Sequence, residues 1–297
     1  MNLYGFTSRK RLFALVIGID SYQHADGYRL RNLNGCVADA KDVALFIHEQ
    51  YSVPHSQITV LLNEQATRAN IKQSIQDFVK LECFDVNDAF VIYFAGHGTQ
   101  VKSPQGWNGI EQSETVEMLI PYDFAPWTSD QENEQGIPNS TLVPLLAQLV
   151  TEKGPNLIVI LDCCHSAFIT RVNREGVDDI DLDSANKNAE THYAIRSVRL
   201  PEDYTILPSI DRDVLERASK PVWLKSYQAT LKPFVSDMYG GASHTLLAAC
   251  GKDQTAKEMH GRGQFTRALM AYLRDPAVDA TIMTFRDIIE SLPTLQG

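Results

Sequence analysis

A histidine and a cysteine stand where two predicted strands end. The stretch "VIYFAGHG" (Val91–Gly98) places His97 between two glycines, and "LIVILDCC" (Leu157–Cys164) ends in two adjacent cysteines. An imidazole beside a cysteine holds the sulfur as a thiolate and later protonates the amine that leaves. His97 and Cys164 are therefore the candidate base and nucleophile of a reactive pair.

Strand alternation predicts which of the two cysteines faces the site. Side chains two positions apart share a face of a strand, so Asp162 and Cys164 point together, while Cys163 points away and packs as a small hydrophobe. A carboxylate in the same cleft as the nucleophile attracts a Lys or Arg side chain of a substrate. The combination predicts a cysteine peptidase that cleaves after basic residues.

The same strand ends supply backbone donors for the oxyanion that develops in such a reaction. Gly96 and Gly98 let the backbone approach a substrate closely, because neither has a Cβ atom. We predict the N–H groups of Gly98 and Cys164 as the oxyanion donors.

Each motif also has a simpler interpretation. A lone GHG is more often a turn, "DCCH" alone fits a capped strand end or an incidental metal site, and Asp162 alone fits a helix cap. The functional interpretation depends on co-occurrence, because ligands of open α/β sheets bind beyond the carboxyl ends of the strands. Structural zinc is not expected, because the sequence has no spaced CxxC pair. Nor does a G-x-G-x-x-G motif follow the first strand, which argues against nucleotide binding.

The composition is that of an acidic globular protein. The 297 residues carry a net charge of −10, with 44% hydrophobic and 22% charged residues. The acidic balance argues against nucleic acid or an anionic membrane surface as a partner. The apolar run at residues 12–19 is too short to span a bilayer. Five cysteines, an odd number with two adjacent, predict reduced thiols in an intracellular, cytoplasmic protein.

Strand and helix patterns alternate along the chain. We predict strands at 12–19, 57–62, 89–95, 156–164 and 243–250, and helices at 34–50, 67–80, 142–150, 264–273 and 284–292. Thr67 is the expected N-cap of the second helix, and Pro144 is expected near the first turn of the third. This order predicts an α/β fold with a parallel sheet that helices cover on both faces. Two polar segments, 99–139 and 171–241, are predicted to be loops or linkers.

Taken together, these motifs resemble the metacaspases within the caspase-like cysteine peptidases, including the short caspase-domain proteins of fungi. "FAGHG" and "DCCHSA" carry most of the resemblance, and the second cysteine stands 67 residues after the histidine. Further similar stretches are "ALVIGIDSY", "LNGCVADAKDVALF", "VEMLIPYDF", "LLAACGKDQTAKE" and "GRGQFTRALM". The QAC-type motif of true caspases is absent. The similarity covers most of residues 11–292, except the two long loops.

The resemblance implies a caspase-like three-layer α/β/α sandwich with a mainly parallel central sheet, in a single domain over residues 8–297. It implies His97 and Cys164 as a dyad that acts through a thioester. It also implies an S1 pocket, formed by Cys36, Asp39 and Asp162, that binds Arg or Lys at P1.

The resemblance also implies how the chain is divided and processed. Residues 8–172 correspond to a large-subunit-like part, residues 242–297 to a small-subunit-like part, and 173–241 to a linker where self-cleavage is expected. The candidate cleavage sites, which the sequence does not rank, are Arg174, Arg196, Arg199, Arg217 and Lys220. Metacaspases generally act as monomers on protein or peptide substrates, and the chemistry requires no cofactor.

Some positions depart from the family pattern. Ala95 replaces the usual serine two residues before the histidine, and Ala167 replaces a glycine after the cysteine motif. The aspartates that bind activating calcium in many metacaspases are not recognisable, and Arg171 stands where one is expected, which argues against calcium activation. These departures leave a second hypothesis open, in which the chain is a caspase-like binding or regulatory module with little turnover.

Overall fold

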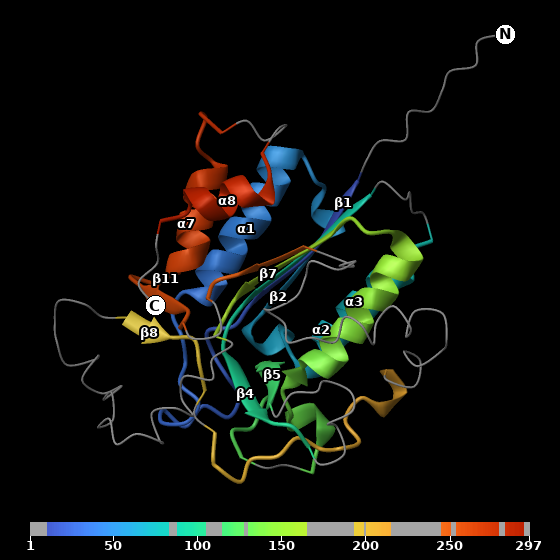
Figure 1. Ribbon diagram of the computed structural model, residues 1–297, viewed down its shortest axis with the longest axis vertical. Helices are drawn as coiled ribbons and strands as arrows, with labels where there is room; N and C mark the ends of the chain where they lie inside the picture. The colour runs from blue at the N-terminus through green and yellow to red at the C-terminus, as the bar shows by residue number, and fades with distance from the viewer. Residues whose placement is uncertain are drawn as a thin grey trace.

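Figure 1 shows the fold as a computed structural model, which describes residues 11–82, 88–104, 115–127, 130–164, 193–198, 200–214, 245–250, 254–278 and 283–293. The strands are β1 (Leu12–Gly18), β2 (Ile58–Leu62), β3 (Ala89–Ala95), β4 (Gly98–Lys102), β5 (Thr115–Leu119), β6 (Ile137–Pro138), β7 (Leu157–Asp162), β8 (Tyr193–Ile195), β9 (Thr245–Ala248), β10 (Lys257–Met259) and β11 (Arg262–Gly263). The helices are α1 (Cys36–Tyr51), α2 (Arg68–Val79), α3 (Asn139–Lys153), α7 (Gln264–Leu273) and α8 (Phe285–Ser291). Short 3₁₀ turns lie at His55–Gln57, Asn63–Gln65 and Glu132–Glu134.

Five strands form an all-parallel central sheet in the order β2-β1-β3-β7-β9. Parallel neighbours need long crossovers, and α1, α2 and α3 lie in the connections β1–β2, β2–β3 and β3–β7. The predicted parallel α/β sheet is thus confirmed. The register pairs Ala95, the last residue of β3, with Asp162, the last residue of β7. The carboxyl ends of these two strands therefore lie side by side.

Helices cover both faces of the sheet (Figure 1). Alternate residues of β1 point to opposite sides: Leu15 and Ile17 belong to a core cluster with residues of α2 and α3, whereas Ala14 and Val16 belong to a second cluster with residues of α1, α7 and α8. These two cores make the three-layer α/β/α sandwich that the resemblance implied.

Two smaller antiparallel sheets lie beyond the central one. β4, β5 and β6 pair within the segment 99–139, which the sequence analysis took for a loop, so that prediction was wrong for these strands. β5 pairs with both β4 and β6. Strands as short as these show little alternation of polar and apolar residues in the sequence. The other small sheet has the order β11-β10-β8.

Part of the predicted linker is also well packed. We call residues 193–198 and 200–214 the strap. It contains β8, and Tyr204, Ile206, Ile210 and Val214 are buried in the core cluster on the α2 and α3 side. This part of the predicted 171–241 loop is therefore structured. Its apolar residues show no helical or strand period, but they pack into a core that other elements form.

Most of the predicted helices and strands agree with the structure to within one or two residues. Thr67 caps α2, with its side chain accepting from Asn70 N–H, as predicted. Helix α3 begins three residues earlier than expected, so Pro144 lies inside the helix and not near its first turn. The buried residues Ser140 and Thr141 extend this helix N-terminally by tertiary packing. In the described residues, no helix is both long and apolar enough to cross a bilayer.

Candidate active site

The neighbouring strands β3 and β7 bring the two candidate catalytic residues to one edge of the sheet. His97 and Cys164 each follow the last paired position, Ala95 opposite Asp162, by two residues. Gly98 lies against this junction, since a Cβ there would be 2.1 Å from the carbonyl oxygen of Cys164. A residue with a side chain therefore does not fit at this position.

The two adjacent cysteines face different surroundings. Cys163 is fully buried in the main core cluster. Cys164 lies in a separate small cluster with Cys250 and Ala256. This separation agrees with the expectation that Cys163 packs in the core while its neighbour faces another environment.

The imidazole of His97 is buried, and the backbone fixes its orientation. Nε2 lies 2.7 Å from the carbonyl oxygen of Arg31, and a carbonyl only accepts, so Nε2 carries the proton. Nδ1 is left unprotonated and has no hydrogen-bond partner in the described part of the chain. The ring also packs 5.0 Å from that of Tyr22, whose hydroxyl accepts the His97 N–H. Burial lowers the pKa of His97 to about 4, so the ring is a neutral base at pH 7.

The thiol of Cys164 has other partners in this conformation. Ala256 N–H donates to Sγ at 3.2 Å, and the carbonyl oxygen of Ala256 lies 3.5 Å from the same sulfur. Cys250 lies in the same small cluster, and its thiol donates to the carbonyl oxygen of Cys163 at 3.5 Å. Burial raises the pKa of the Cys164 thiol, which keeps it protonated. Within the part of the chain that the structure describes, no hydrogen bond joins Cys164 Sγ to His97.

An arginine of the strap lies between these groups. The N–H groups of Gly98 and Cys164 both donate to the carbonyl oxygen of Arg196, at 3.1 and 3.2 Å. The N–H of Arg196 donates to Ala256 O at 3.0 Å. The two predicted oxyanion donors thus converge on a single carbonyl oxygen.

The guanidinium of Arg196, which is 0% exposed, is surrounded by three carboxylates. Nη1 lies 2.8 Å from Asp162 Oδ2, and Nη2 lies 2.7 Å from Asp39 Oδ2 and 3.5 Å from Glu258 Oε2. Burial opposes the charge of Arg196, but its neighbours, Asp162 foremost and then Cys36 and Asp39, raise its pKa well above the ordinary value. Burial also raises the pKa values of Asp39 and Glu258, and Arg196 acts against that rise. The pocket is therefore matched to one buried cation.

The residues before Arg196 lie as an added strand. β8 pairs antiparallel with β10, with Ala194 opposite Glu258 and Ile195 opposite Lys257. An extended peptide that adds to a sheet edge in this way is a common mode of peptide recognition. The strap thus lies in the site as a bound peptide would, with its arginine side chain in the acidic pocket.

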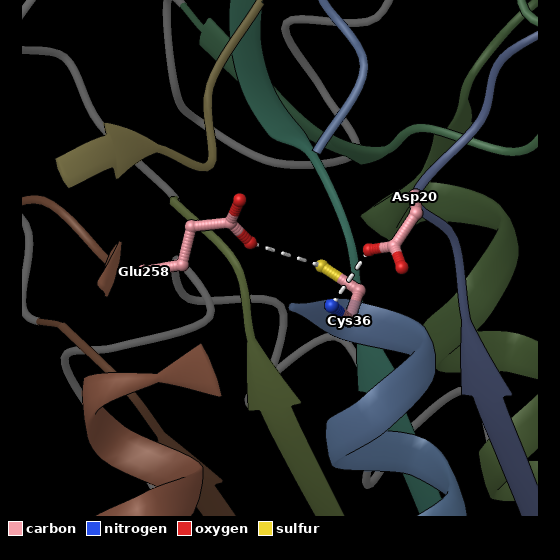
Figure 2. Close-up of side chains that lie close together, drawn as sticks. All are labelled: Asp20, Cys36 and Glu258. Atoms are coloured by element: carbon pink, nitrogen blue, oxygen red, sulfur yellow. Dashed lines mark hydrogen bonds between the residues drawn. The ribbon is translucent and has the colours of Figure 1, made fainter. Parts of the chain in front are cut away.

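The third predicted pocket residue, Cys36, lies at the start of α1 beside two carboxylates (Figure 2). Its Sγ is 3.9 Å from Glu258 Oε2, and its N–H donates to Asp20 Oδ1 at 2.7 Å. Among the described residues, these three offer ligand atoms within 4.8 Å of one another, a spacing at which a metal ion could be held. Both carboxylates, however, already accept backbone N–H groups at the start of α1: Asp20 those of Cys36 and Val37, Glu258 those of Asn34 and Gly35. These hydrogen bonds account for their positions without an ion.

The structure adds functional groups that the sequence analysis missed. Glu258 lies within "AKEM", and an isolated acid on a three-residue strand carries no signal of its own. The carbonyl of Arg31 orients His97. Every residue has a backbone carbonyl, so the residue type at position 31 gives no sign of this contact. Arg196 was one of several unranked cleavage candidates, and the others (Arg174, Arg199, Arg217 and Lys220) lie outside the described residues.

A model of the caspase domain matches residues 11–291, so the chain belongs to the caspase-domain family of cysteine peptidases. It is similar to Metacaspase III c of the diatom Phaeodactylum tricornutum (29% identity, covering 52% of this chain and 43% of that protein). It is also similar to Metacaspase-1A of Neurospora crassa (30%, covering 56% and 35%) and to Metacaspase-3 of Arabidopsis thaliana (28%, covering 49% and 40%). The matched region thus spans less than half the length of each of these relatives.

The fold is also similar to a solved structure. The crystal structure of protein GSU0716 from Geobacter sulfurreducens aligns with a TM-score of 0.57, covering 96% of this chain and 90% of that one. At 19% sequence identity, this likeness is evidence for the fold alone.

Proposed function

We propose that this chain is a cysteine endopeptidase that cleaves peptide bonds after Arg or Lys, and that the conformation described above is latent, with Arg196 in the chain's own S1 pocket. The observation that carries the proposal is the position of Arg196. Its guanidinium lies among Asp39, Asp162 and Glu258, while its carbonyl oxygen accepts from Gly98 and Cys164. A substrate with a basic P1 residue would need both sets of contacts.

The residues have defined roles once the Cys164 thiol leaves Ala256, first on the strap itself and, after its release, on a substrate. The thiol of Cys164 turns to the free Nδ1 of His97, which takes its proton. The sulfur then attacks the carbonyl carbon on the carboxyl side of the P1 residue, and the N–H groups of Gly98 and Cys164 stabilise the oxyanion. His97 returns the proton to the leaving amine, a thioester remains on Cys164, and water hydrolyses it. This chemistry requires no cofactor.

Latency follows from the same contacts. The strap occupies the oxyanion donors and the pocket, and the Cys164 thiol is held by Ala256 while it stays protonated. A buried thiol without a base at hydrogen-bond distance is a weak nucleophile. A cut of the strap, followed by its release, would free the oxyanion donors and the pocket for a substrate.

The activity test uses fluorogenic peptides with Arg, Lys or Asp at P1, with the wild-type chain and with Arg196→Gln. Cleavage after Arg and Lys but not Asp is expected. Cys164→Ala should lower kcat by roughly 10⁴-fold or more, because it removes the nucleophile. Cys163→Ala is the matched control and should keep its activity, because Cys163 packs in the core.

Undiminished activity in Cys164→Ala, or a preference for Asp at P1, would overturn the assignment. Absence of turnover in all forms would favour the second hypothesis, a caspase-like binding module.

A further inference from the structure

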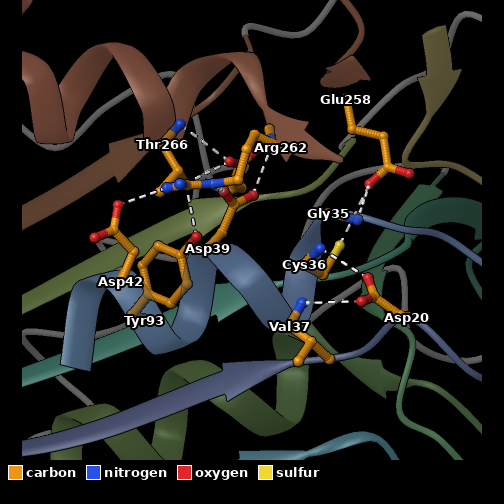
Figure 3. A network of polar contacts seen from close by, with 12 residues as sticks. Asp20, Gly35, Cys36, Val37, Asp39, Asp42, Tyr93, Glu258, Arg262 and Thr266 are labelled. Carbon is orange, nitrogen blue, oxygen red and sulfur yellow. Dashed lines mark hydrogen bonds and ion pairs between the residues drawn. The ribbon is translucent and has the colours of Figure 1, made fainter. Parts of the chain in front are cut away.

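The segment Arg262–Thr266 contacts the carboxylates around Arg196, and Figure 3 shows its two end residues near Asp39; we call this segment the S1 wall. Gly263 N–H donates to Asp39 Oδ2 at 2.7 Å, and Arg262 Nε donates to Asp39 Oδ1 at 2.6 Å. Thr266 donates to Oδ2 of Asp162 through its N–H at 3.2 Å and through Oγ1 at 2.5 Å. The S1 wall therefore holds the two carboxylates that lie closest to the guanidinium.

We propose that the S1 wall determines P1 specificity and makes the pocket select Arg over Lys. The inference rests on the proposed function and adds to it the residues that set the preference. Within the wall, Gly263 is a specificity-determining residue that borders the cation, and Thr266 is a positioning residue that acts through Asp162.

The selection of Arg follows from the placement of the two carboxylates. Asp162 meets Nη1 and Asp39 meets Nη2, so two separate nitrogens are bound from two separate elements. Nη1 also donates to the main-chain oxygen of Asp162 at 3.1 Å. A planar guanidinium matches such a divided set of acceptors, whereas the single ammonium nitrogen of Lys cannot occupy both positions.

The carboxylates are not free to move toward a smaller cation. Arg262 holds Oδ1 of Asp39 from outside the pocket, and its Nη2 bonds to Asp42 Oδ2 at 2.6 Å. Each carboxylate is buried and held by the wall. A Lys side chain would therefore leave at least one of them without its cation, which is costly in a buried site.

Gly263 leaves room for the guanidinium. A Cβ at this position would lie 2.5 Å from Asp162 Oδ2 and 2.7 Å from both Arg196 Nη1 and Asp39 Oδ2. All three atoms belong to buried, mutually bonded side chains, so none can retreat without breaking an ion pair. The guanidinium can therefore reach both carboxylates only because residue 263 has no side chain.

Thr266 orients Asp162 through a buried chain of hydroxyl groups. The hydroxyl of Tyr93 lies 2.6 Å from Thr266 Oγ1. The Thr266 proton goes to the carboxylate, which only accepts, so Tyr93 must donate to Thr266. Both side chains are fully buried. The relay from β3 through α7 aims Oδ2 of Asp162 at the P1 cation.

The experiment compares the peptides Tyr-Ala-Ile-Arg and Tyr-Ala-Ile-Lys, which reproduce residues 193–196, with a fluorogenic leaving group. The full-length chain carries Arg196→Gln in every variant, so that the strap does not fill the pocket with its own arginine. We expect kcat/KM for the Arg peptide to exceed that for the Lys peptide by about tenfold or more, as the loss of a charge-assisted hydrogen bond implies.

Two variants test the S1 wall directly. Thr266→Val should raise KM for the Arg peptide by roughly tenfold or more with a smaller change in kcat, and Thr266→Ser should restore it. Gly263→Ala should lower kcat/KM for the Arg peptide by roughly 100-fold and for the Lys peptide by less, because displacement of the P1 group misplaces the scissile bond. Thr151→Val is the matched control, since the Thr151 hydroxyl donates to Ala147 O within α3, at 2.8 Å.

The ratio of the two kcat/KM values does not depend on the fraction of folded enzyme, so partial misfolding does not obscure the result. Equal cleavage of both peptides by the background chain, or an unchanged ratio in both Thr266→Val and Gly263→Ala, would overturn the inference and leave the proposed function standing. Cleavage of neither peptide would count against the proposed function itself.

Discussion

At the scale of single residues, burial keeps both groups of the proposed dyad uncharged. His97 is neutral and Cys164 is protonated, because each charged form would lie away from water. Formation of an ion pair between them requires the thiol to leave Ala256 and turn toward His97. The latent state is thus a property of environment and not of residue type.

The low pKa of His97 predicts how the stability of the latent form depends on pH. The folded chain keeps this ring neutral down to about pH 4, whereas an unfolded histidine takes up a proton near 6.5. Below pH 6.5 the unfolded state therefore binds more protons, and the free energy of unfolding falls by roughly 2 kcal/mol from pH 7 to pH 5 through this group. Urea unfolding of Cys164→Ala at both pH values, with and without His97→Gln, measures this contribution. The same pH-dependent loss in both proteins would contradict the prediction.

At the scale of elements, the strap is anchored on both sides of Arg196. On the amino-terminal side β8 pairs with β10. On the carboxyl-terminal side, the buried carboxylate of Asp211 bonds to Arg68, to Lys72 and to the hydroxyl of Thr141, which belong to α2 and α3. Although burial opposes its charge, these partners, Arg68 foremost, lower the pKa of Asp211. A cut after Arg196 would therefore leave the following segment attached to the core.

This anchoring is tested by Asp211→Ala. Removing one partner of a buried ion pair costs about 3–5 kcal/mol, because the remaining charges lose their compensation. Hydrogen exchange should show faster exchange at residues 200–214, with little change in β1 and β3. Glu202→Ala, at an exposed position of the same segment, is the control and should exchange like wild type. Unaltered protection of 200–214 in Asp211→Ala would show that the ion cluster does not hold the strap.

At the scale of the whole molecule, one chain supplies both the enzyme-like cleft and the peptide-like strap. The carboxylates around Arg196 come from α1, β7 and β10, and the strap reaches them from the segment between β7 and β9. If the proposed activity holds, such an arrangement predicts that the first cut is intramolecular, because the fold sets the local concentration of the target bond.

We therefore expect cleavage of the bond between Arg196 and Ser197 to be first order in protein. The rate constant of the cut, followed by gel electrophoresis and mass spectrometry, should stay unchanged over a roughly 100-fold range of protein concentration. The fold, and not the bulk solution, then sets the effective concentration of the target bond. Arg196→Gln and Cys164→Ala should each abolish this cut. A rate constant that rises in proportion to concentration would show that one molecule cuts another.

Local patterns in the sequence were sufficient to predict the strands that position the site. The strand ends at His97 and Cys164 were predicted from continuous apolar runs, and their meeting at one edge from the parallel βα order. The pocket acids Asp39 and Asp162 came from the resemblance and from strand alternation. Glu258 and the carbonyl of Arg31 could not be predicted. Each contacts a residue that is distant in the sequence, and no local sequence pattern indicates such a contact.

By itself, the sequence determined the three-layer fold, and it predicted the edge of the sheet and the two residues, His97 and Cys164, on which the proposed chemistry depends. These depend on the periodicity and residue type of contiguous segments, which a linear chain displays. Only the tertiary structure decided that Arg196, out of the basic residues of a polar linker, lies in the acidic pocket with its carbonyl on the oxyanion donors. That choice depends on contacts among α1, β7, β10 and α7, which are far apart in the chain and come together only when it folds.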